Sequence, residues 1–141
     1  MIPDDYLPDV HNRLIMYKRI SSATSDDQLR SLEIEMIDRF GLLPPPSKTL
    51  FRVARLRVAA DALGLTKIDA SAGGGALEFG SQTRVDPMAI VTLVQQQPKQ
   101  FRLEGGTRLR FIHDLSEHER RISFIEELLA RLALSQPTKP R

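Results

Sequence analysis

Apolar residues recur at spacings of three and four along the first part of the chain, which is the pattern of amphipathic helices. The first helix is expected to begin near Pro8. Its expected buried stripe consists of Leu7, Val10, Leu14, Tyr17 and Ile20. A second helix is expected over residues 26–40, because Ser25 and Gln28 match a capping box. Only a short polar loop separates the two helices, so they should form an antiparallel pair.

The second helix has two faces of different character. The face expected to be buried holds Leu29, Leu32, Glu33, Met36, Ile37 and Phe40. The other face carries Glu35, Asp38 and Arg39, with the apolar Ile34 beside Asp38. Glu35 and Arg39 have the spacing of a solvated surface ion pair, which contributes only a few tenths of a kcal/mol. Spacing alone favours that solvated pair, whereas Ile34 within the charged face is typical of an interaction surface, so both interpretations stay open. We take these four residues as the candidate partner-binding site.

A third helix is expected after the proline run at 44–46, opened by Ser47 or Thr49 and continuing to about Leu63. Its apolar residues occupy two sides rather than one stripe. They are Val53, Leu56, Ala60 and Leu63 on one side, and Leu50, Phe51, Ala54 and Val58 on the other. A helix that is apolar on two sides is usually packed between other elements, so we expect it to be central.

The second half of the chain reads as two β-hairpins and two helices. Strands are expected at 65–70 and 76–79 around a glycine-rich turn, and at 101–103 and 108–111 around a two-residue turn at Gly105-Gly106. One helix is expected to begin at Asp86 with Met88, Val91 and Val94 at helical spacing. The other is expected after a capping box of Ser116 and Glu119, ending near Leu134, with a buried side of Ile122, Ile125, Leu129 and Leu132.

These elements predict an α+β fold. An antiparallel helix pair and a central helix pack with two β-hairpins that form a small antiparallel sheet, and two further helices complete it. Residues 1–134 are expected to form a single domain, and residues 135–141, with Pro137 and Pro140, a disordered tail.

Composition narrows the class of protein. The content of 41% hydrophobic and 27% charged residues is ordinary for a globular protein, and the formal net charge is only +2. The sequence has no cysteine, which excludes disulfides and thiolate metal sites. No apolar run approaches the length of a membrane span, and the N-terminus is acidic where a signal peptide would be basic. We therefore expect a cytoplasmic protein with no membrane partner.

No catalytic or metal-binding motif stands out. His11, His113 and His118 lack the spacing of a metal-binding or nucleophile–base motif, so we interpret them as surface histidines. The glycines at 73–75 lack the following helix and Lys-Ser/Thr pair of a phosphate-binding loop. We therefore expect no enzymatic activity and no cofactor in this chain.

Nucleic-acid binding is the alternative function. Its candidate residues are Arg52, Arg55 and Arg57 in the third helix and Arg102, Arg108 and Arg110 in the last hairpin. Arginines that alternate with aromatic residues suit base stacking, but aromatic residues make up only 6% of the chain. Phe101 and Phe111 are also needed for the core, so this function is the less favoured of the two.

The sequence resembles the C-terminal domain of the bacterial transcription-repair coupling factor (Mfd) over residues 2 to 134. The resemblance rests on Ile2-Pro3-Asp4-Asp5-Tyr6-Leu7-Pro8-Asp9-Val10, Arg13-Leu14, Tyr17-Lys18-Arg19-Ile20, Glu35-Met36-Ile37-Asp38-Arg39-Phe40-Gly41-Leu42-Leu43-Pro44, Ala54-Arg55-Leu56-Arg57, Leu63-Gly64 and Thr107-Arg108-Leu109-Arg110-Phe111. These motifs are specific in combination, and none of them is a catalytic signature.

The resemblance implies that the chain is part of a larger ATP-driven DNA translocase, which removes stalled RNA polymerase and recruits UvrA for nucleotide excision repair. ATP and magnesium belong to its upstream motor domains. In the family this domain is an autoinhibitory clamp that docks on the UvrB-like module of the same protein and covers the surface that UvrA would use. A Glu, an Asp and an Arg of the family's second helix make that contact, and they match Glu35, Asp38 and Arg39.

Overall fold

The computed structural model describes residues 1–133, which divide into two compact units. The first unit comprises residues 1–58, and the second begins at Ala59. The expected disordered tail at 135–141 and the expected helix end at Leu134 lie outside the described residues. That residues 1–134 form one domain stays a prediction.

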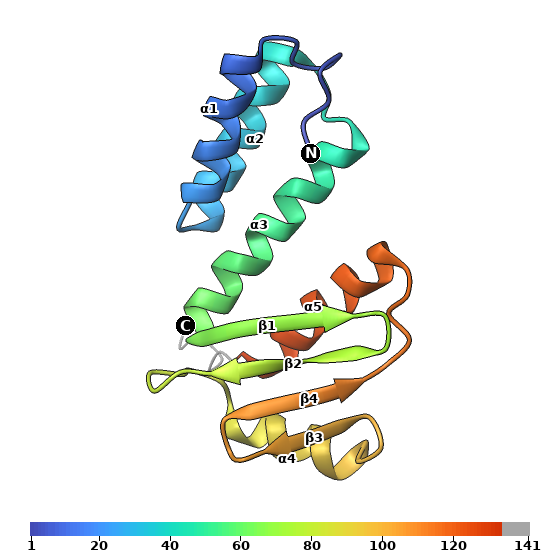
Figure 1. Cartoon of the computed structure of the whole chain (residues 1–141). Helices are drawn as coiled ribbons and strands as arrows, with labels where there is room; N and C mark the ends of the chain where they lie inside the picture. The colour runs from blue at the N-terminus through green and yellow to red at the C-terminus, as the bar shows by residue number, and fades with distance from the viewer. Residues whose placement is uncertain (134–141) are drawn as a thin grey trace, which may run out of the picture. The chain divides into compact units, whose positions relative to one another are not determined.

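The first unit contains three helical segments. They are α1 (Val10–Ser22), α2 (Asp26–Phe40) and the first part of α3 (Pro45–Leu63). Figure 1 shows α1 and α2 side by side and antiparallel, which confirms the predicted helix pair. The Ser25 hydroxyl accepts a hydrogen bond from the Gln28 backbone N–H, as the capping box predicts. The Gln28 side chain, however, accepts from the backbone N–H of Thr24 rather than of Ser25.

The core of the first unit gathers apolar side chains from all three helices and from the N-terminal segment. Its members include Ile2, Leu7, Met16, Ile20, Leu29, Leu32, Met36, Phe51 and Ala54. Part of the expected α1 stripe is wrong, because Val10 and Leu14 are 58% and 61% exposed. The face of α1 that carries Met16 and Ile20 is the buried one. Ile37, expected to be buried in α2, is 38% exposed.

The three prolines open α3 as well as ending the α2 segment. Gly41 caps α2 with φ of 94°, a left-handed backbone that suits glycine. The α3 helix then begins at Pro45, two residues earlier than the first residue expected, because proline is tolerated in a first helical turn. Ser47 is therefore not a helix cap. It is fully buried, and its hydroxyl donates to the Met1 carbonyl at 3.0 Å, which ties the N-terminal segment to α3.

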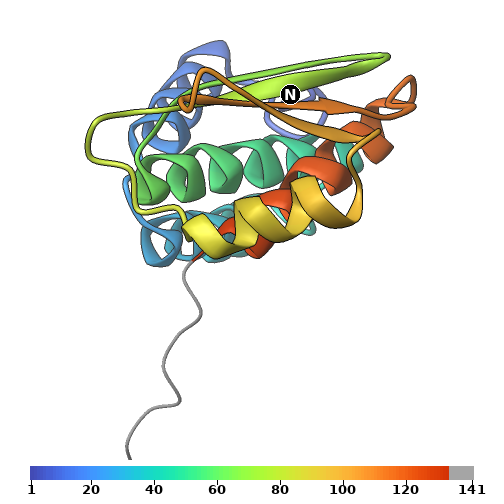
Figure 2. The same cartoon turned by 90° about the horizontal axis from the view of Figure 1, so that it is seen from below.

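The second unit is built on one four-stranded antiparallel sheet. Its strands, in the order β1-β2-β4-β3, are β1 (Leu65–Ser71), β2 (Gly74–Phe79), β4 (Arg108–Ile112) and β3 (Phe101–Glu104). The helices α4 (Pro87–Gln96) and α5 (His118–Leu132) both lie on one face of this sheet (Figures 1 and 2). The five helices and the four-stranded antiparallel sheet of residues 1–133 confirm the predicted α+β class.

Glycine allows two strands to approach each other closely in the first hairpin. A Cβ atom at Gly75 would lie 1.9 Å from the carbonyl oxygen of Asp69, on the paired strand. The turn itself is only Ala72-Gly73, shorter than the five residues expected. The second hairpin has a three-residue loop at 105–107 rather than two residues, and Gly105 and Gly106 both have positive φ.

One helix prediction in the second unit needs correction. The predicted capping box at Ser116 is wrong, because the Ser116 hydroxyl donates to Asp114 at 2.8 Å and α5 has no side-chain cap. The Asp114 carboxylate competes successfully for that hydroxyl. In α4 the buried residue is Leu93, whereas Met88 and Val91 are exposed. The predicted buried side of α5 is confirmed, with Leu128 in addition.

Candidate partner-binding site

The C-terminal half of α2 is held firmly enough to present a fixed surface. Leu32 and Met36 anchor its inner face in the core of the first unit. At its end, the Tyr6 hydroxyl donates to the Gly41 carbonyl at 2.7 Å and lies 3.2 Å from the Met36 carbonyl. The Tyr6 hydroxyl therefore ties the N-terminal segment to the end of α2. The outer face of α2 therefore has a defined position relative to the N-terminal segment.

Glu35 lies at the centre of an ion-pair network that joins α1 to α2. Arg19 of α1 donates to both of its carboxylate oxygens, at 2.7 and 2.8 Å. Arg39, one turn further along α2, donates to the same carboxylate at 3.3 Å. The hydrogen bonds from Arg19, followed by its charge and by Arg39, hold the pKa of Glu35 at about 2, below its ordinary value of 4.5. Glu35 is thus ionised at neutral pH and already engaged within the unit.

Asp38, Arg39 and Ile34 are the members of the cluster that face outward. Asp38 is exposed and makes no hydrogen bond or ion pair within residues 1–133. The Arg39 guanidinium lies 4.9 Å from the centre of the Phe40 ring, and half of its side chain is accessible. Ile34 is 54% exposed, and the exposed Ile37 is another apolar side chain on α2. The outer face of α2 therefore presents the anion Asp38, the cation Arg39, which is held by Glu35, and the apolar side chain of Ile34.

Arg19 is the functional residue that the sequence reading missed. Spacing within one helix identifies the Glu35–Arg39 pair, but the Arg19–Glu35 contact spans two helices. A signal was nevertheless present, because Arg19 lies in the last turn of α1. In an antiparallel pair, the last turns of the first helix pack beside the early and middle turns of the second. A basic residue there can reach an acidic residue of its neighbour.

Comparison with known proteins identifies the family. The family described as "TRCF domain" matches residues 1–90 of this chain. The chain belongs to the TRCF domain family. Its relatives include the transcription-repair-coupling factor of Escherichia coli, which is 46% identical over 132 residues, and that of Haemophilus influenzae, which is 41% identical over 133 residues. Each alignment covers 94% of this chain but only 12% of the relative. The chain is thus a small TRCF domain and not the motor region of those proteins.

A solved structure has the same fold as this TRCF domain. It is described as the C-terminal domain of transcription-repair coupling factor, and it aligns with a TM-score of 0.71 at 18% sequence identity. The alignment covers 96% of this chain and 89% of that chain. At this identity the comparison supports the α+β architecture and not the roles of individual residues.

The arginines considered for nucleic-acid binding are mostly engaged within the TRCF domain itself. Arg55 pairs with Glu33, and Arg57 donates to the backbone carbonyls of Ile20 and Ala23. Arg108 and Arg110 both pair with Glu104, and Arg108 also pairs with Glu78. Arg52 has an interaction partner as well. Because Arg55, Arg108 and Arg110 are each paired with a carboxylate of this chain, they provide little of the phosphate attraction that drives nucleic-acid binding.

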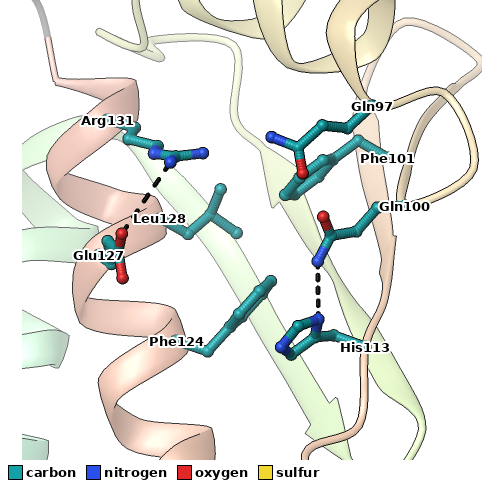
Figure 3. Close-up of a pocket in the computed structure, with 8 residues that line it drawn as sticks. All are labelled: Gln97, Gln100, Phe101, His113, Phe124, Glu127, Leu128 and Arg131. Carbon is teal, nitrogen blue, oxygen red and sulfur yellow. Dashed lines mark hydrogen bonds and ion pairs between the residues drawn. The ribbon is translucent and has the colours of Figure 1, made fainter.

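A small pocket lies in the second unit between α5 and the start of β3 (Figure 3). Its volume is about 200 Å³ and its lining residues are Gln97, Gln100, Phe101, His113, Phe124, Glu127, Leu128 and Arg131. Four of these polar residues interact in pairs, since the Gln100 amide nitrogen lies 2.8 Å from His113 Nδ1 and Arg131 pairs with Glu127 at 3.9 Å. The volume is also smaller than that of typical ligand sites. The pocket therefore gives no support to a small-molecule reaction.

Metal sites and membrane-spanning helices are both absent from the part of the chain that the structure describes. Residues 1–133 contain no group of three or more acidic or histidine side chains placed to hold a metal ion. Within the same residues, no helix is both long and apolar enough to cross a membrane. The α2 surface is therefore the feature on which we base a function.

Proposed function

We propose that this TRCF domain is an autoinhibitory, protein-binding domain of a transcription-repair coupling factor. The parent protein would be an ATP-driven DNA translocase of the cytoplasm that removes stalled RNA polymerase and recruits UvrA in nucleotide excision repair. In this proposal the outer face of α2 docks on the UvrB-like module of the same parent protein. Docking masks the surface that UvrA would occupy. The fraction of parent molecules in which this domain is docked, compared with the fraction in which it is released, then determines how much UvrA is recruited.

The observation that carries this proposal is the organised charge on the outer face of α2. Asp38 and Arg39 are adjacent in the sequence and have opposite charges. Glu35, held by Arg19, also accepts a hydrogen bond from Arg39. Mixed charges give register and partner specificity with modest net affinity, which suits a contact that has to open. Ile34 and Ile37 supply the small apolar area that such an interface also needs.

The ion pairs within the unit support a proposal in which fewer residues touch the partner. Glu35 is occupied by two arginines, so its replacement would disturb the unit as well as the interface. We assign Glu35 and Arg19 to positioning Arg39, and we assign the direct contacts to Asp38, Arg39 and Ile34. A basic group of the partner would face Asp38, and an acceptor would face Arg39.

Binding in trans tests this proposal. The parent protein from which this domain has been removed is titrated with this chain in a calorimeter. Asp38→Lys should weaken binding about tenfold or more, because it places a cation against the partner's basic group. Asp61→Lys is the matched control, since Asp61 is an exposed aspartate on α3 with no ion pair within residues 1–133. Equal affinity for wild type and Asp38→Lys would remove the α2 face from the docking contact.

A further inference from the structure

A second surface of the first unit carries apolar side chains that nothing in that unit covers. Val10 and Leu14 lie one turn apart on α1, and they are 58% and 61% exposed. Val53, on α3, is 45% exposed. Apolar residues at helical spacing usually mark a buried face, and here the first unit buries Met16 and Ile20 of α1 instead. The exposed stripe is therefore a candidate for contact with another molecule.

The stripe borders an open groove between α1 and the first part of α3. The groove has a volume of about 690 Å³, and its lining residues are Leu14, Tyr17, Lys18, Ile20, Ser21, Leu50, Val53, Ala54 and Arg57. All of them belong to the first unit. Two helices that flank an apolar floor form the kind of groove in which a third helix packs. From Leu14 to Ser21 the groove extends about 10 Å along α1, which is two turns of helix.

The charged side chains that line the groove are all positive. Its two charged lining residues are cations, Lys18 and Arg57, and no acidic side chain lines it. Arg57 is fixed in place because its guanidinium donates to the carbonyls of Ala23 and Ile20 at 2.7 and 3.3 Å. The Lys18 ammonium group makes no ion pair within residues 1–133. A ligand that fills this groove should therefore combine apolar side chains with carboxylates.

We propose that the groove binds an amphipathic, acidic α-helix of a partner protein. Leucine-like side chains at spacings of three and four would contact Leu14 and Val53, and flanking carboxylates would face Lys18 and Arg57. The groove differs from the proposed α2 contact, because none of Ile34, Asp38 and Arg39 lines it. Arg19 is directed to Glu35 of α2, whereas Lys18 lines the groove.

Other occupants fit the groove less well. In a symmetric pair of copies, each groove would face its equivalent, and the Lys18 and Arg57 cations of both copies would be brought together without counter-charges. A nucleic acid would meet a mostly apolar floor with only two cations, one of which already binds backbone carbonyls. An acidic amphipathic helix would pack its apolar side chains on the groove floor and place its carboxylates near Lys18 and Arg57.

A designed helical peptide tests the proposal with the full chain. The probe is a fluorescent peptide of about 15 residues, long enough for measurable helicity, with leucines at spacings of three and four and glutamates beside them. A matched peptide carries lysines in place of the glutamates. The acidic peptide should bind with a Kd below about 100 µM in an anisotropy titration, and the basic peptide should bind at least about tenfold more weakly.

Substitutions locate the binding. Leu14→Glu and Lys18→Glu should each weaken binding of the acidic peptide about tenfold. Their controls are Val91→Glu on α4 and Lys67→Glu on β1, which change exposed residues outside the groove and should have no effect. Because Leu14 is 61% exposed, its replacement should leave the circular dichroism spectrum unchanged.

Several results would overturn the proposal. One is failure of the acidic peptide to bind, and another is equal binding of the acidic and basic peptides. Binding that survives Leu14→Glu would place the peptide elsewhere on the chain. Concentration-dependent dimerisation that Leu14→Glu abolishes would assign the groove to a second copy of this chain.

Discussion

Arg19 and Glu35 form a two-bond contact across the α1–α2 pair, with each carboxylate oxygen of Glu35 accepting from a different nitrogen of the same guanidinium. This fork-to-fork geometry fixes direction as well as distance, which a lysine in place of Arg19 would not do. Because Arg39 binds the same carboxylate, the contact also restricts where Arg39 can reach. The Arg19–Glu35 pair therefore helps to fix the position of Arg39 on the outer face of α2.

Loss of this contact should lower stability modestly. Arg19→Met keeps the aliphatic stem and removes the guanidinium, so it should cost about 1 kcal/mol, the upper part of the range for partly exposed ion pairs. The unfolding midpoint should fall by roughly 4 °C at pH 7. Arg30→Met on α2 is the control, since Arg30 is exposed and has no ion pair within residues 1–133. Equal midpoints for the two variants would show that the Arg19 contact contributes nothing.

The same contact predicts how stability depends on pH. The folded pKa of Glu35, about 2, lies below its ordinary 4.5, so folding favours the ionised carboxylate. Its stabilising contribution should be complete above pH 4.5 and should be lost as the pH falls toward 2. Urea unfolding of wild type and Glu35→Gln at several pH values measures this. The difference between them should shrink across that window, and a difference that stays constant would contradict the assignment.

Reversal of charge at Glu35 and at Asp38 should have different consequences. Glu35→Lys places a cation between Arg19 and Arg39, so it should lower the unfolding midpoint by more than Arg19→Met does. Asp38→Lys should change the midpoint by little, because Asp38 makes no bond within residues 1–133. Differential scanning fluorimetry of both variants separates a positioning role from a contact role. Equal losses in both variants would count against this division.

The sequence predicted the positions of the helices and strands well, but it predicted less well which face of a helix is buried. The bounds of α2 follow from local signals, since Ser25 and Gly41 mark its two ends. The buried face of α1 does not follow from local signals, because two faces of that helix carry apolar residues. Met16 and Ile20 are buried, and Val10 and Leu14 are not. Which face is buried depends on the helices packed against it, and periodicity alone does not contain that information.

The candidate site was predictable in part for a similar reason. Glu35, Asp38 and Arg39 share a face through their spacing within one helix, and the structure places them on the outer side of α2. That Glu35 is engaged and Asp38 is not depends on Arg19, sixteen positions before Glu35 and on another helix. A contact between helices depends on their rotation and register, which the sequence pattern did not fix.

The close approach at Gly75 gives a prediction for the second unit. Gly75→Ala would place a Cβ atom 1.9 Å from the Asp69 carbonyl oxygen, so the β1–β2 pair would have to separate. We expect a loss of at least about 3 kcal/mol in the free energy of unfolding. Gly73→Ala is the control, because a Cβ atom at Gly73 meets nothing within 4 Å. Chemical denaturation compares the two, and similar stabilities would contradict the register of this hairpin.

Affinity for UvrA measures the central claim most directly. Asp38→Lys is introduced into the full-length parent protein, with Asp61→Lys as its control, and UvrA binding is titrated in the absence of RNA polymerase. If the α2 face closes over the UvrB-like module, Asp38→Lys should raise UvrA affinity about tenfold and Asp61→Lys should leave it unchanged. An Asp38→Lys protein that is folded, and that binds UvrA no more tightly than wild type, would contradict the account.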